Sequence, residues 1–423
     1  MSTKRGAFME SVGAAEQKTP FSCLKIAKQC STTAAKDENF VFSPYSIQLG
    51  LSLLTNGSSG LTKTELLNFL EAENMDDLNS LSEKVLDTLC KSQNGDPVLS
   101  LLFGVWIDES LTIKTPFKDT VAKVYRAKAE TIDFQDEAKS KDAIQKVNRW
   151  AEEATNGLIK SVLPEDDFDP CRRIILANVL YFKGRWCNEF DPSITKERKF
   201  YLHGGNSVEA PFMCSGKDQN IATFEDFKIL RLPYERKTWQ KSMSMYILLP
   251  NERDGLWSLI DMVASDPLFI EKYISPMIAK VRVGEFMVPK FKIGYGFDAK
   301  EVLEAVGMKL PFSGNAELDE MAHGSNTLVS KVIQKSYIDV NEEGTEAAAV
   351  TIVLHAMCSP GPPKRPKDQV DFVADHPFIF MVRSNLSGAV LFMGHVVNQG
   401  LKNRQISRYI AIKTVFPAIR YDI

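Results

Sequence analysis

The 423-residue chain has little net charge, because 51 lysines and arginines stand against 54 acidic residues and leave a formal charge of -3. This balance provides no field that would draw in nucleic acid or anionic lipid. No run of the sequence approaches the ~18 consecutive apolar residues that a membrane-spanning helix needs. We therefore expect neither nucleic acid nor a membrane as a partner.

Cysteine is sparse, and its seven residues are scattered without a CxxC pair. Such spacing fits neither a disulfide framework nor a zinc site, so we expect a reducing compartment, no metal and no cofactor. Residues 1–20 begin with basic residues but lack the apolar core of a secretory signal. The sequence thus predicts a polar N-terminal extension on a cytoplasmic or nucleocytoplasmic protein, and it leaves extracellular release open.

The motifs of common enzymes are missing, since the sequence has no GxSxG, no HExxH, no GxxxxGK[ST] and no GxGxxG after a strand. Asp375 beside His376 invites a Ser-His-Asp triad, but the sequence offers no exposed nucleophile to complete it. His376 precedes a proline and is better explained as the start of a buried strand. We expect no enzyme, and a hydrolase is the third and most distant of the functions considered.

Hydrophobic periodicity predicts an α+β fold. Apolar residues return every three or four positions, as in amphipathic helices, in 20–30, 62–72, 78–90 and 142–163. Runs rich in β-branched and aromatic residues predict strands in 98–108, 171–182, 241–250, 279–293, 332–340, 378–384 and 389–397. No linker separates the helix-rich first half from the strand-rich second half. One domain is expected over residues 21–398, with an unassigned tail over 399–423.

Residues 341–368, NEEGTEAAAVTIVLHAMCSPGPPKRPKD, join two segments with opposite backbone requirements. From Thr345 to Met357 there is no proline or glycine, and extended at ~3.3 Å per residue Thr345 to Cys358 would span on the order of 45 Å. The next segment cannot enter a central ladder, because its prolines lack the N–H group that the ladder uses. These prolines are Pro360, Pro362, Pro363 and Pro366.

The first segment also alternates in a way that suits insertion between strands that are already packed. One face of an extended chain would carry only small or β-branched residues, namely Thr345, Ala347, Ala349, Thr351 and Val353. Gly344 would let the backbone turn without steric cost. Composition alone leaves an ordinary alanine-rich connection equally open, because alanine favours helix over strand.

Six motifs in order resemble the serpin family, and most closely its plant members, over roughly Phe21 to Val397. They are NFVFSPYSIQLGLSLL, VNRWAEEATNGLIKSVLP, LANVLYFKGRW, NEEGTEAAAVT, DFVADHPFIFMVR and AVLFMGHVV. The resemblance implies a single-domain α+β fold with a large central mixed sheet, additional sheets and surrounding helices. It also implies an exposed reactive loop, residues 344–370, that offers a bait bond to a protease.

In a serpin, cleavage of the bait lets the loop insert as a new strand of the large sheet while the protease is still acylated. The resemblance places the reactive bond between Cys358 and Ser359, flanked by Met357 and Ala356. The hinge that inserts first would comprise Glu342, Glu343, Gly344, Thr345, Glu346, Ala347, Ala348 and Ala349. Cleavage after Lys364 or Arg365 is the rival, but it would put prolines into the sheet interior.

The resemblance also assigns two groups of supporting residues. The shutter, a hydrogen-bonded cluster beneath the point where the strands part, would comprise Ser43, Ser46, Asn178 and Gln334. The breach at the top of the sheet would include Trp186 and Lys290, and Lys290 would pair with Glu342 to hold the sheet closed. The expected partner is a target protease of the serine or papain-like cysteine class, met by a monomer.

Two departures from the family pattern keep a second function open. Gln334 stands where serpins usually have a shutter histidine, and His355 would lie on the inward face late in the inserted strand, where an unpaired imidazole is costly. The intact small-residue hinge favours a suicide-substrate inhibitor. The alternative is a non-inhibitory serpin that acts in storage, as a chaperone or as a binding partner.

Overall fold

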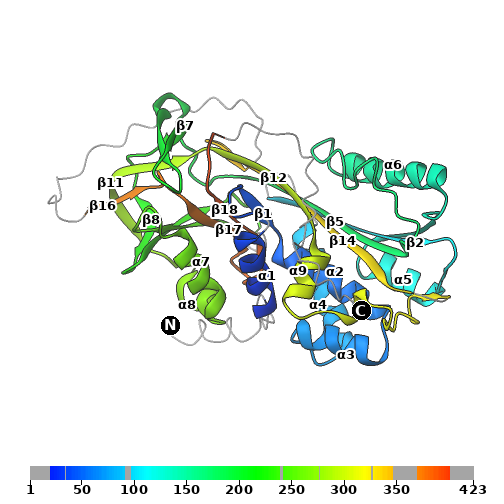
Figure 1. Ribbon diagram of the computed structural model, residues 1–423. Helices are drawn as coiled ribbons and strands as arrows, with labels where there is room; N and C mark the ends of the chain where they lie inside the picture. Colours follow the sequence, from blue (N-terminus) through cyan, green and yellow to red (C-terminus); the bar gives the residue numbers. More distant parts are fainter. Residues whose placement is uncertain are drawn as a thin grey trace, which may run out of the picture.

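The computed structural model describes residues 20–33, 35–90, 97–238, 242–275, 277–324, 327–345 and 369–400. The helices are α1 (Phe21–Thr32), α2 (Pro44–Asn56), α3 (Gly60–Phe69), α4 (Met75–Cys90), α5 (Thr115–Lys123), α6 (Glu137–Ala154), α7 (Leu256–Ser265), α8 (Phe269–Tyr273) and α9 (Ala299–Ala305). Short 3-10 turns lie at Pro192–Ile194 and Leu310–Phe312. Figure 1 shows the helices around two sheets that meet near the middle of the molecule.

One sheet is covered by helices on both faces and contains the longest strands; its members are β2 (Val98–Asp108), β4 (Lys128–Ile132), β5 (Ile174–Arg185), β12 (Phe291–Asp298), β14 (Val329–Val340) and β15 (Gly344–Thr345). They form one mixed sheet in the order β12-β14-β15-β5-β2-β4, in which β14 and β5 also pair directly. We call this sheet the large sheet. The predicted α+β class with a large mixed sheet is confirmed.

A second sheet packs at one end of the molecule. It contains β1 (Phe40–Phe42), β6 (Lys196–Tyr201), β7 (Ser207–Cys214), β8 (Gln219–Thr223), β9 (Phe227–Pro233), β10 (Met243–Pro250), β11 (Lys280–Pro289), β16 (Gln369–Val373), β17 (Phe378–Ser384) and β18 (Val390–Val396). A small pair joins β3 (Thr112–Ile113) to β13 (Ala322–His323). Strand β10 is buried at every position, and all of its residues except Ser244 are apolar.

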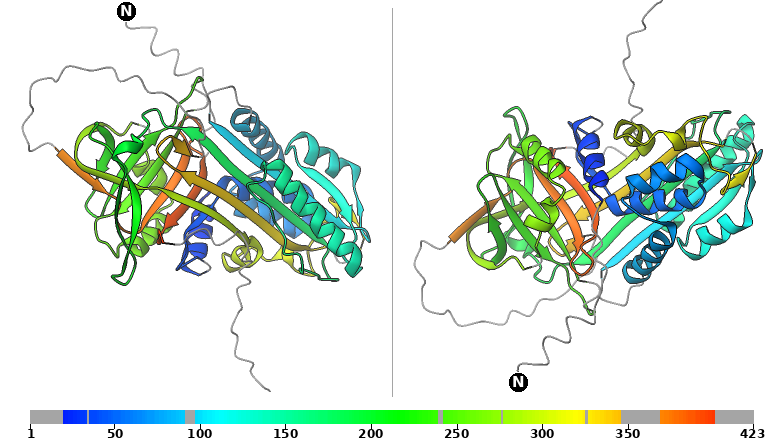
Figure 2. Two further views of the ribbon diagram at one scale, coloured as in Figure 1. Left: turned by 90° about the horizontal axis from the view of Figure 1, so that it is seen from above. Right: turned by 90° about the horizontal axis from the view of Figure 1, so that it is seen from below.

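Helices cover both faces of the large sheet. On one face, α6 packs Ile144 and Val147 against a cluster that includes Ile333 of β14. On the other face, α2 packs into the main core, which includes Val332 of the same strand. In Figure 2 the view from above has α6 in front of this sheet, and the view from below has the blue α2 in front of it. Adjacent residues of β14 therefore point to different helices.

One predicted helix is too long. The periodic segment 142–163 suggested a helix through its whole length, but α6 ends at Ala154. Asn156 and Gly157 then adopt positive φ angles of 50° and 81°, which a right-handed helix cannot include. The apolar residues beyond this point belong to an irregular segment that leads to β5. Among the described residues, no helix is long and apolar enough to cross a membrane.

Candidate functional site

The distinctive feature of the large sheet is the place where two of its central strands part. Strands β14 and β5 pair directly and in parallel from Val329 opposite Ile174 up to Tyr337 opposite Tyr181. Above that point β15 lies between them, with Thr345 opposite Val340 of β14 and Gly184 of β5. The large sheet therefore holds two residues of an additional strand at one end and closes up below them.

These two residues correct one expectation. The resemblance implied an exposed loop over residues 344–370, yet Thr345 is fully buried in the sheet. The close approach of β5 explains why glycine stands at 344, because a Cβ there would lie 2.0 Å from the carbonyl oxygen of Gly184. The strand therefore begins in contact with β5 along its backbone, and only glycine fits at that position.

A turn built on Asn341 delivers the chain into this position. The Oδ1 atom of Asn341 accepts hydrogen bonds from the backbone N–H groups of Glu343, at 3.0 Å, and Gly344, at 3.2 Å. The backbone N–H of Asn341 donates to the carbonyl of Gly344 at 2.9 Å. Such an asparagine turn is a common local alternative to a backbone turn. It reverses the chain from β14 into β15.

Trp186, a predicted breach residue, holds this turn from the β5 side. Its indole Nε1–H donates to the carbonyl of Asn341 at 2.9 Å, and its backbone N–H donates to the carbonyl of Glu343 at 2.9 Å. The indole stacks on the ring of Tyr234, with 4.6 Å between ring centroids. The breach thus joins the end of β5, the hinge turn and the loop after β9.

Tyr234 in turn contacts the inserted strand directly. Its hydroxyl lies 2.7 Å from Oγ1 of Thr345, and both side chains are buried. Burial raises the pKa of the Tyr234 hydroxyl, so the phenol stays neutral and can donate or accept in this bond. Sequence analysis missed Tyr234, because it belongs to no periodic pattern and meets Thr345 only through the fold.

Glu342 and Lys290 form the predicted pair. Lys290 Nζ lies 2.8 Å from one carboxylate oxygen of Glu342 and donates to the other at 3.1 Å. Thr195 Oγ1 donates to the same carboxylate at 2.8 Å. Burial works to raise the pKa of Glu342, but hydrogen bonds, first among them that from Lys290, hold the pKa below its ordinary value. The carboxylate is therefore charged at neutral pH, and it holds the hinge turn to the residue between β11 and β12 and to the residue just before β6.

Three of the four predicted shutter residues meet through hydrogen bonds. The side chain of Gln334 bonds the backbone of Ser43 twice, accepting from its N–H at 3.3 Å and donating to its carbonyl at 3.1 Å. Ser43 caps α2 by accepting from the backbone N–H of Ser46 at 3.0 Å. Gln334 and Ser43 are each about 1% exposed. The glutamine therefore ties β14 to the start of α2 by two buried bonds.

Asn178, the fourth shutter residue, lies directly opposite Gln334 in the paired strands. Its Oδ1 atom and the Oγ of Ser46 are buried without a hydrogen-bond partner among the described residues. A cavity of about 10 Å³ lies beside Asn178 and is lined in part by Gly50 and Phe103. The shutter thus contains acceptors that its present closed arrangement leaves unused.

Several predicted residues lie outside the described part of the chain and stay predictions. These are the reactive bond Cys358 and Ser359, its flanking Met357 and Ala356, and the hinge residues Glu346, Ala347, Ala348 and Ala349. His355 and the rival positions Lys364 and Arg365 also lie there. The described half of the hinge is Glu342 to Thr345.

The Asp375–His376 pair has a structural explanation. Nδ1 of His376 lies 2.7 Å from the Asp375 carboxylate, while Nε2 lies 2.9 Å from the carbonyl of Pro250. The imidazole is about 6% exposed and comes two residues before β17. Both ring nitrogens thus face fixed acceptors, and neither faces a serine hydroxyl as a catalytic triad requires. Within the described residues, no cluster of three His, Cys, Asp or Glu side chains could hold a metal ion.

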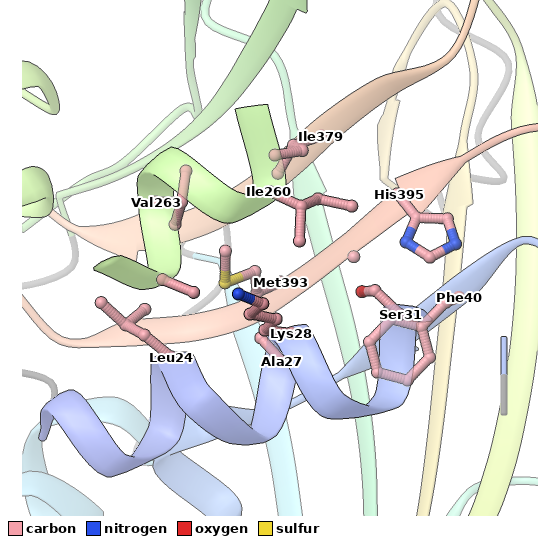
Figure 3. Close-up of a pocket in the computed structure, with 12 residues that line it drawn as sticks. Leu24, Ala27, Lys28, Ser31, Phe40, Ile260, Val263, Ile379, Met393 and His395 are labelled. Carbon is pink, nitrogen blue, oxygen red and sulfur yellow. The ribbon is translucent and has the colours of Figure 1, made fainter. Parts of the chain in front are cut away.

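A small apolar pocket lies away from the place where β14 and β5 part. Figure 3 shows it between α1, α7 and the strands β17 and β18, with His395 at one side. Nε2 of His395 lies 3.1 Å and 3.0 Å from the carbonyls of Ala35 and Glu38, and burial lowers the pKa of His395 to about 4. The pocket volume of about 20 Å³ suits on the order of one water molecule. None of the predicted site residues lines it.

Comparison with known proteins identifies the family. A family model described as serpin (serine protease inhibitor) matches residues 17–399. The chain belongs to the serpin family. It is 43% identical to Serpin-ZX of Arabidopsis thaliana over 384 residues, covering 89% of this chain and 96% of that protein. It is 42% identical to Serpin-ZXA of Oryza sativa subsp. japonica over 385 residues, covering 89% and 95%.

The fold agrees with that of a solved plant serpin. The structure described as Arabidopsis AtSerpin1 in its native stressed conformation superposes with a TM-score of 0.80 at 40% identity, covering 90% of this chain and 97% of that one. The predicted resemblance to plant serpins is confirmed. Serpins are in general protease inhibitors rather than catalysts.

Proposed function

We propose that this serpin is a suicide-substrate inhibitor that traps a serine protease, with papain-like cysteine proteases as a second target class. The protease would attack the carbonyl of Cys358 and break the Cys358–Ser359 bond, leaving an acyl-enzyme on Cys358 and a new N-terminus at Ser359. Insertion of the freed loop into the large sheet would then carry the acylated protease away before water can release it. Inhibition is a race between insertion and deacylation.

The observation that supports this proposal is the register of β15. Thr345 already lies opposite Val340 of β14 and Gly184 of β5. A strand that continued antiparallel to both would bring Thr351 between Gln334 and Asn178, which now face each other. Both registers give the same position, so a single inserting strand could pair with β14 and β5 together. It would separate the two halves of the shutter at that level.

The sequence beyond Thr345 supports the same function. The continuing strand would place small residues at the positions that enter first, and the first of the four prolines comes only after the reactive bond. Bulky or charged residues at a position as buried as Thr345 would prevent entry, because a charge without a partner is costly there. The composition of the hinge therefore suits insertion.

A non-inhibitory role in storage, chaperoning or partner binding is the second candidate. The observation that favours it is the pair of hydrogen bonds between the Gln334 side chain and the backbone of Ser43. This bond holds β14 to α2 at the level where Thr351 would have to enter. If it does not yield during insertion, the loop would be cleaved and the protease released.

We further propose that the protein acts as a monomer in a cytoplasmic or nucleocytoplasmic setting. The setting, though not the monomeric state, is supported by the cysteines, of which Cys23, Cys30, Cys171, Cys187 and Cys214 are unpaired. Unpaired thiols suit a compartment in which glutathione keeps them reduced.

The test is incubation with a panel of serine and papain-like proteases, followed by denaturing gels and mass spectrometry. The proposal predicts a complex that survives denaturant and a released fragment that begins at Ser359. The matched control is Thr345→Arg, which places a charge at a buried hinge position and should be cleaved at the same bond without forming a complex. Cleavage of the unaltered protein with no complex, for every protease that cuts it, would favour the non-inhibitory candidate.

A further inference from the structure

At the end of the large sheet farthest from Gly344, one carboxylate ties β14 to the segment that leads into β5. Lys331 of β14 donates from Nζ to both carboxylate oxygens of Asp167, at 2.9 Å and 2.7 Å. Asp167 belongs to the segment between α6 and β5. The two side chains are only 17% and 19% exposed. This pair is therefore better shielded from water than most surface ion pairs.

The same carboxylate also meets a buried arginine. The NH2 group of Arg172 lies 3.1 Å from Asp167 Oδ2, and its NH1 group donates to the backbone carbonyl of Asp167 at 2.9 Å. The arginine side chain is fully buried, and its guanidinium lies over the ring of Phe134 at 5.5 Å. Asp167 thus holds two cations, one on β14 and one just before β5.

A third contact joins the same two parts of the chain. The backbone N–H of Arg173, one residue before β5, donates to Oγ of Ser330 in β14 at 2.8 Å. We refer to Asp167, Arg172, Arg173, Ser330 and Lys331 as the lower clamp. It ties the beginning of β5 to the beginning of β14, at the level of the lowest direct pair, Val329 and Ile174.

The lower clamp stands where an inserting strand arrives last. For a strand to lie between β14 and β5 over their whole length, the two must move apart by one strand spacing, ~4.8 Å. If the segment that contains Asp167 stays with β5, the Lys331–Asp167 hydrogen bonds break and the two charged groups are no longer paired. Breaking a part-buried ion pair costs more than breaking an exposed one. The contacts therefore oppose the last stage of separation.

We infer that Asp167 is the latch of this last stage: it holds β14 to the segment before β5 until the inserted strand reaches the lower end of the sheet. This inference rests on the proposed trapping function. Asp167 does not touch the reactive bond, so it is a positioning residue that acts through strand separation. A looser latch would speed insertion relative to deacylation, and it would also shorten the life of the intact, uninserted form.

The test compares Asp167→Asn with Asp339→Asn. Asp339 of β14 lies 3.2 Å from Lys292 of β12, and β12 and β14 are neighbours that insertion does not part. Both variants remove one carboxylate charge that pairs with a lysine of the large sheet, but only Asp167→Asn weakens a contact between the parts that insertion would move apart. Lys331→Met is a second variant that leaves the Asp167–Arg172 pair in place, in case Asp167→Asn does not fold.

Two quantities are measured in each variant. The first is the number of inhibitor molecules consumed per protease trapped, and the second is the rate at which intact protein, kept warm, turns into a heat-resistant inactive form. We expect Asp167→Asn and Lys331→Met to lower the number of inhibitor molecules consumed per trapped protease towards one. They should also raise the rate of conversion on warming roughly fivefold, the ratio that loss of one such ion pair gives. Asp339→Asn should change neither.

The outcomes separate the latch from the proposed function. If the unaltered protein traps no protease, the trapping function fails, and the warming rate still reports on the latch without any protease. If the protein traps protease but the Asp167 and Lys331 variants match Asp339→Asn in both measurements, the latch is refuted. The double variant should equal the stronger single variant, because both changes break the same Lys331–Asp167 contact.

Discussion

The two buried bonds between Gln334 and Ser43 give a prediction whose size follows from the structure. Gln334→Met keeps an unbranched side chain of similar length but removes both polar atoms. The N–H and carbonyl of Ser43 then lose the partners that now lie at 3.3 Å and 3.1 Å. Each buried backbone group left unpaired costs about 1–3 kcal/mol, so the intact protein should lose about 3 kcal/mol.

This loss is measurable as a shift of the first thermal transition. With an unfolding entropy of roughly 2 cal/mol/K per residue, about 3 kcal/mol corresponds to a fall of about 4 °C in the midpoint for a chain of this size. Circular dichroism of the uncleaved protein measures it. The control is Gln219→Met in β8, where the glutamine bonds only the side chain of Ser215 and the shift should stay below about 1 °C.

The same variant should also loosen the shutter. Without the amide, β14 is no longer bonded to the start of α2 at the level of Asn178, so warm intact protein should reach the heat-resistant inactive form faster. The rate for Gln334→His should lie between those of the unaltered protein and Gln334→Met, because one imidazole cannot make both hydrogen bonds to the backbone of Ser43. A midpoint for Gln334→Met equal to that of the Gln219 control would refute this account of the shutter.

Three further predictions concern the breach and the core. Tyr234→Phe removes the 2.7 Å bond to Thr345, so hydrogen exchange of the hinge amides should rise roughly fivefold, since such a bond contributes about 1 kcal/mol; unchanged exchange would show that the hinge is held by its backbone alone. The lowered pKa of Glu342 means that its contribution to stability is present above its ordinary pKa and is lost as pH falls through the folded value. In Lys290→Met the thermal midpoint should therefore fall less steeply than in the unaltered protein as the pH drops below ~4.5. Identical curves of midpoint against pH for the two proteins would contradict this prediction. The pKa of His395 falls to about 4 on burial, so the unfolded chain binds the proton first and the native state should lose roughly 2 kcal/mol between pH 7 and pH 5; His395→Gln should remove that loss, and an unchanged pH profile would rule out His395 as its cause.

The sequence could predict the features that depend on short segments of the chain or on a family motif. The strand-forming run of β14 follows from a pattern within a short segment, whereas the hinge was assigned from the family resemblance. The Lys290–Glu342 pair was expected from the family resemblance, and the two groups do lie 2.8 Å apart. Local chemistry and a family pattern were sufficient for these features, because each depends on few neighbours.

The parts that could not be predicted depend on contacts between distant segments. Thr345 enters the sheet because Gly344, which has no Cβ, can approach the backbone of Gly184, and because Tyr234 lies within reach of the Thr345 hydroxyl. Gln334 was predicted to belong to the hydrogen-bonded shutter, but its partner is the backbone of Ser43, and a backbone partner leaves no signal in the sequence. The lower clamp could not be predicted either, because Asp167 and Lys331 are far apart in the chain.

The central claim is that the large sheet accepts the cleaved loop as a full strand, and the heat stability of the cleaved protein tests it most directly. A protease that cuts within residues 346–358 would be used to nick the loop, and the thermal midpoints of cut and uncut protein would be compared by circular dichroism. We predict a much higher midpoint after cleavage, because an inserted strand would pair with both β14 and β5 and relieve the strain of the intact form. The Thr345→Arg variant should show no such rise. An equal or lower midpoint after cleavage of the unaltered protein would contradict the account.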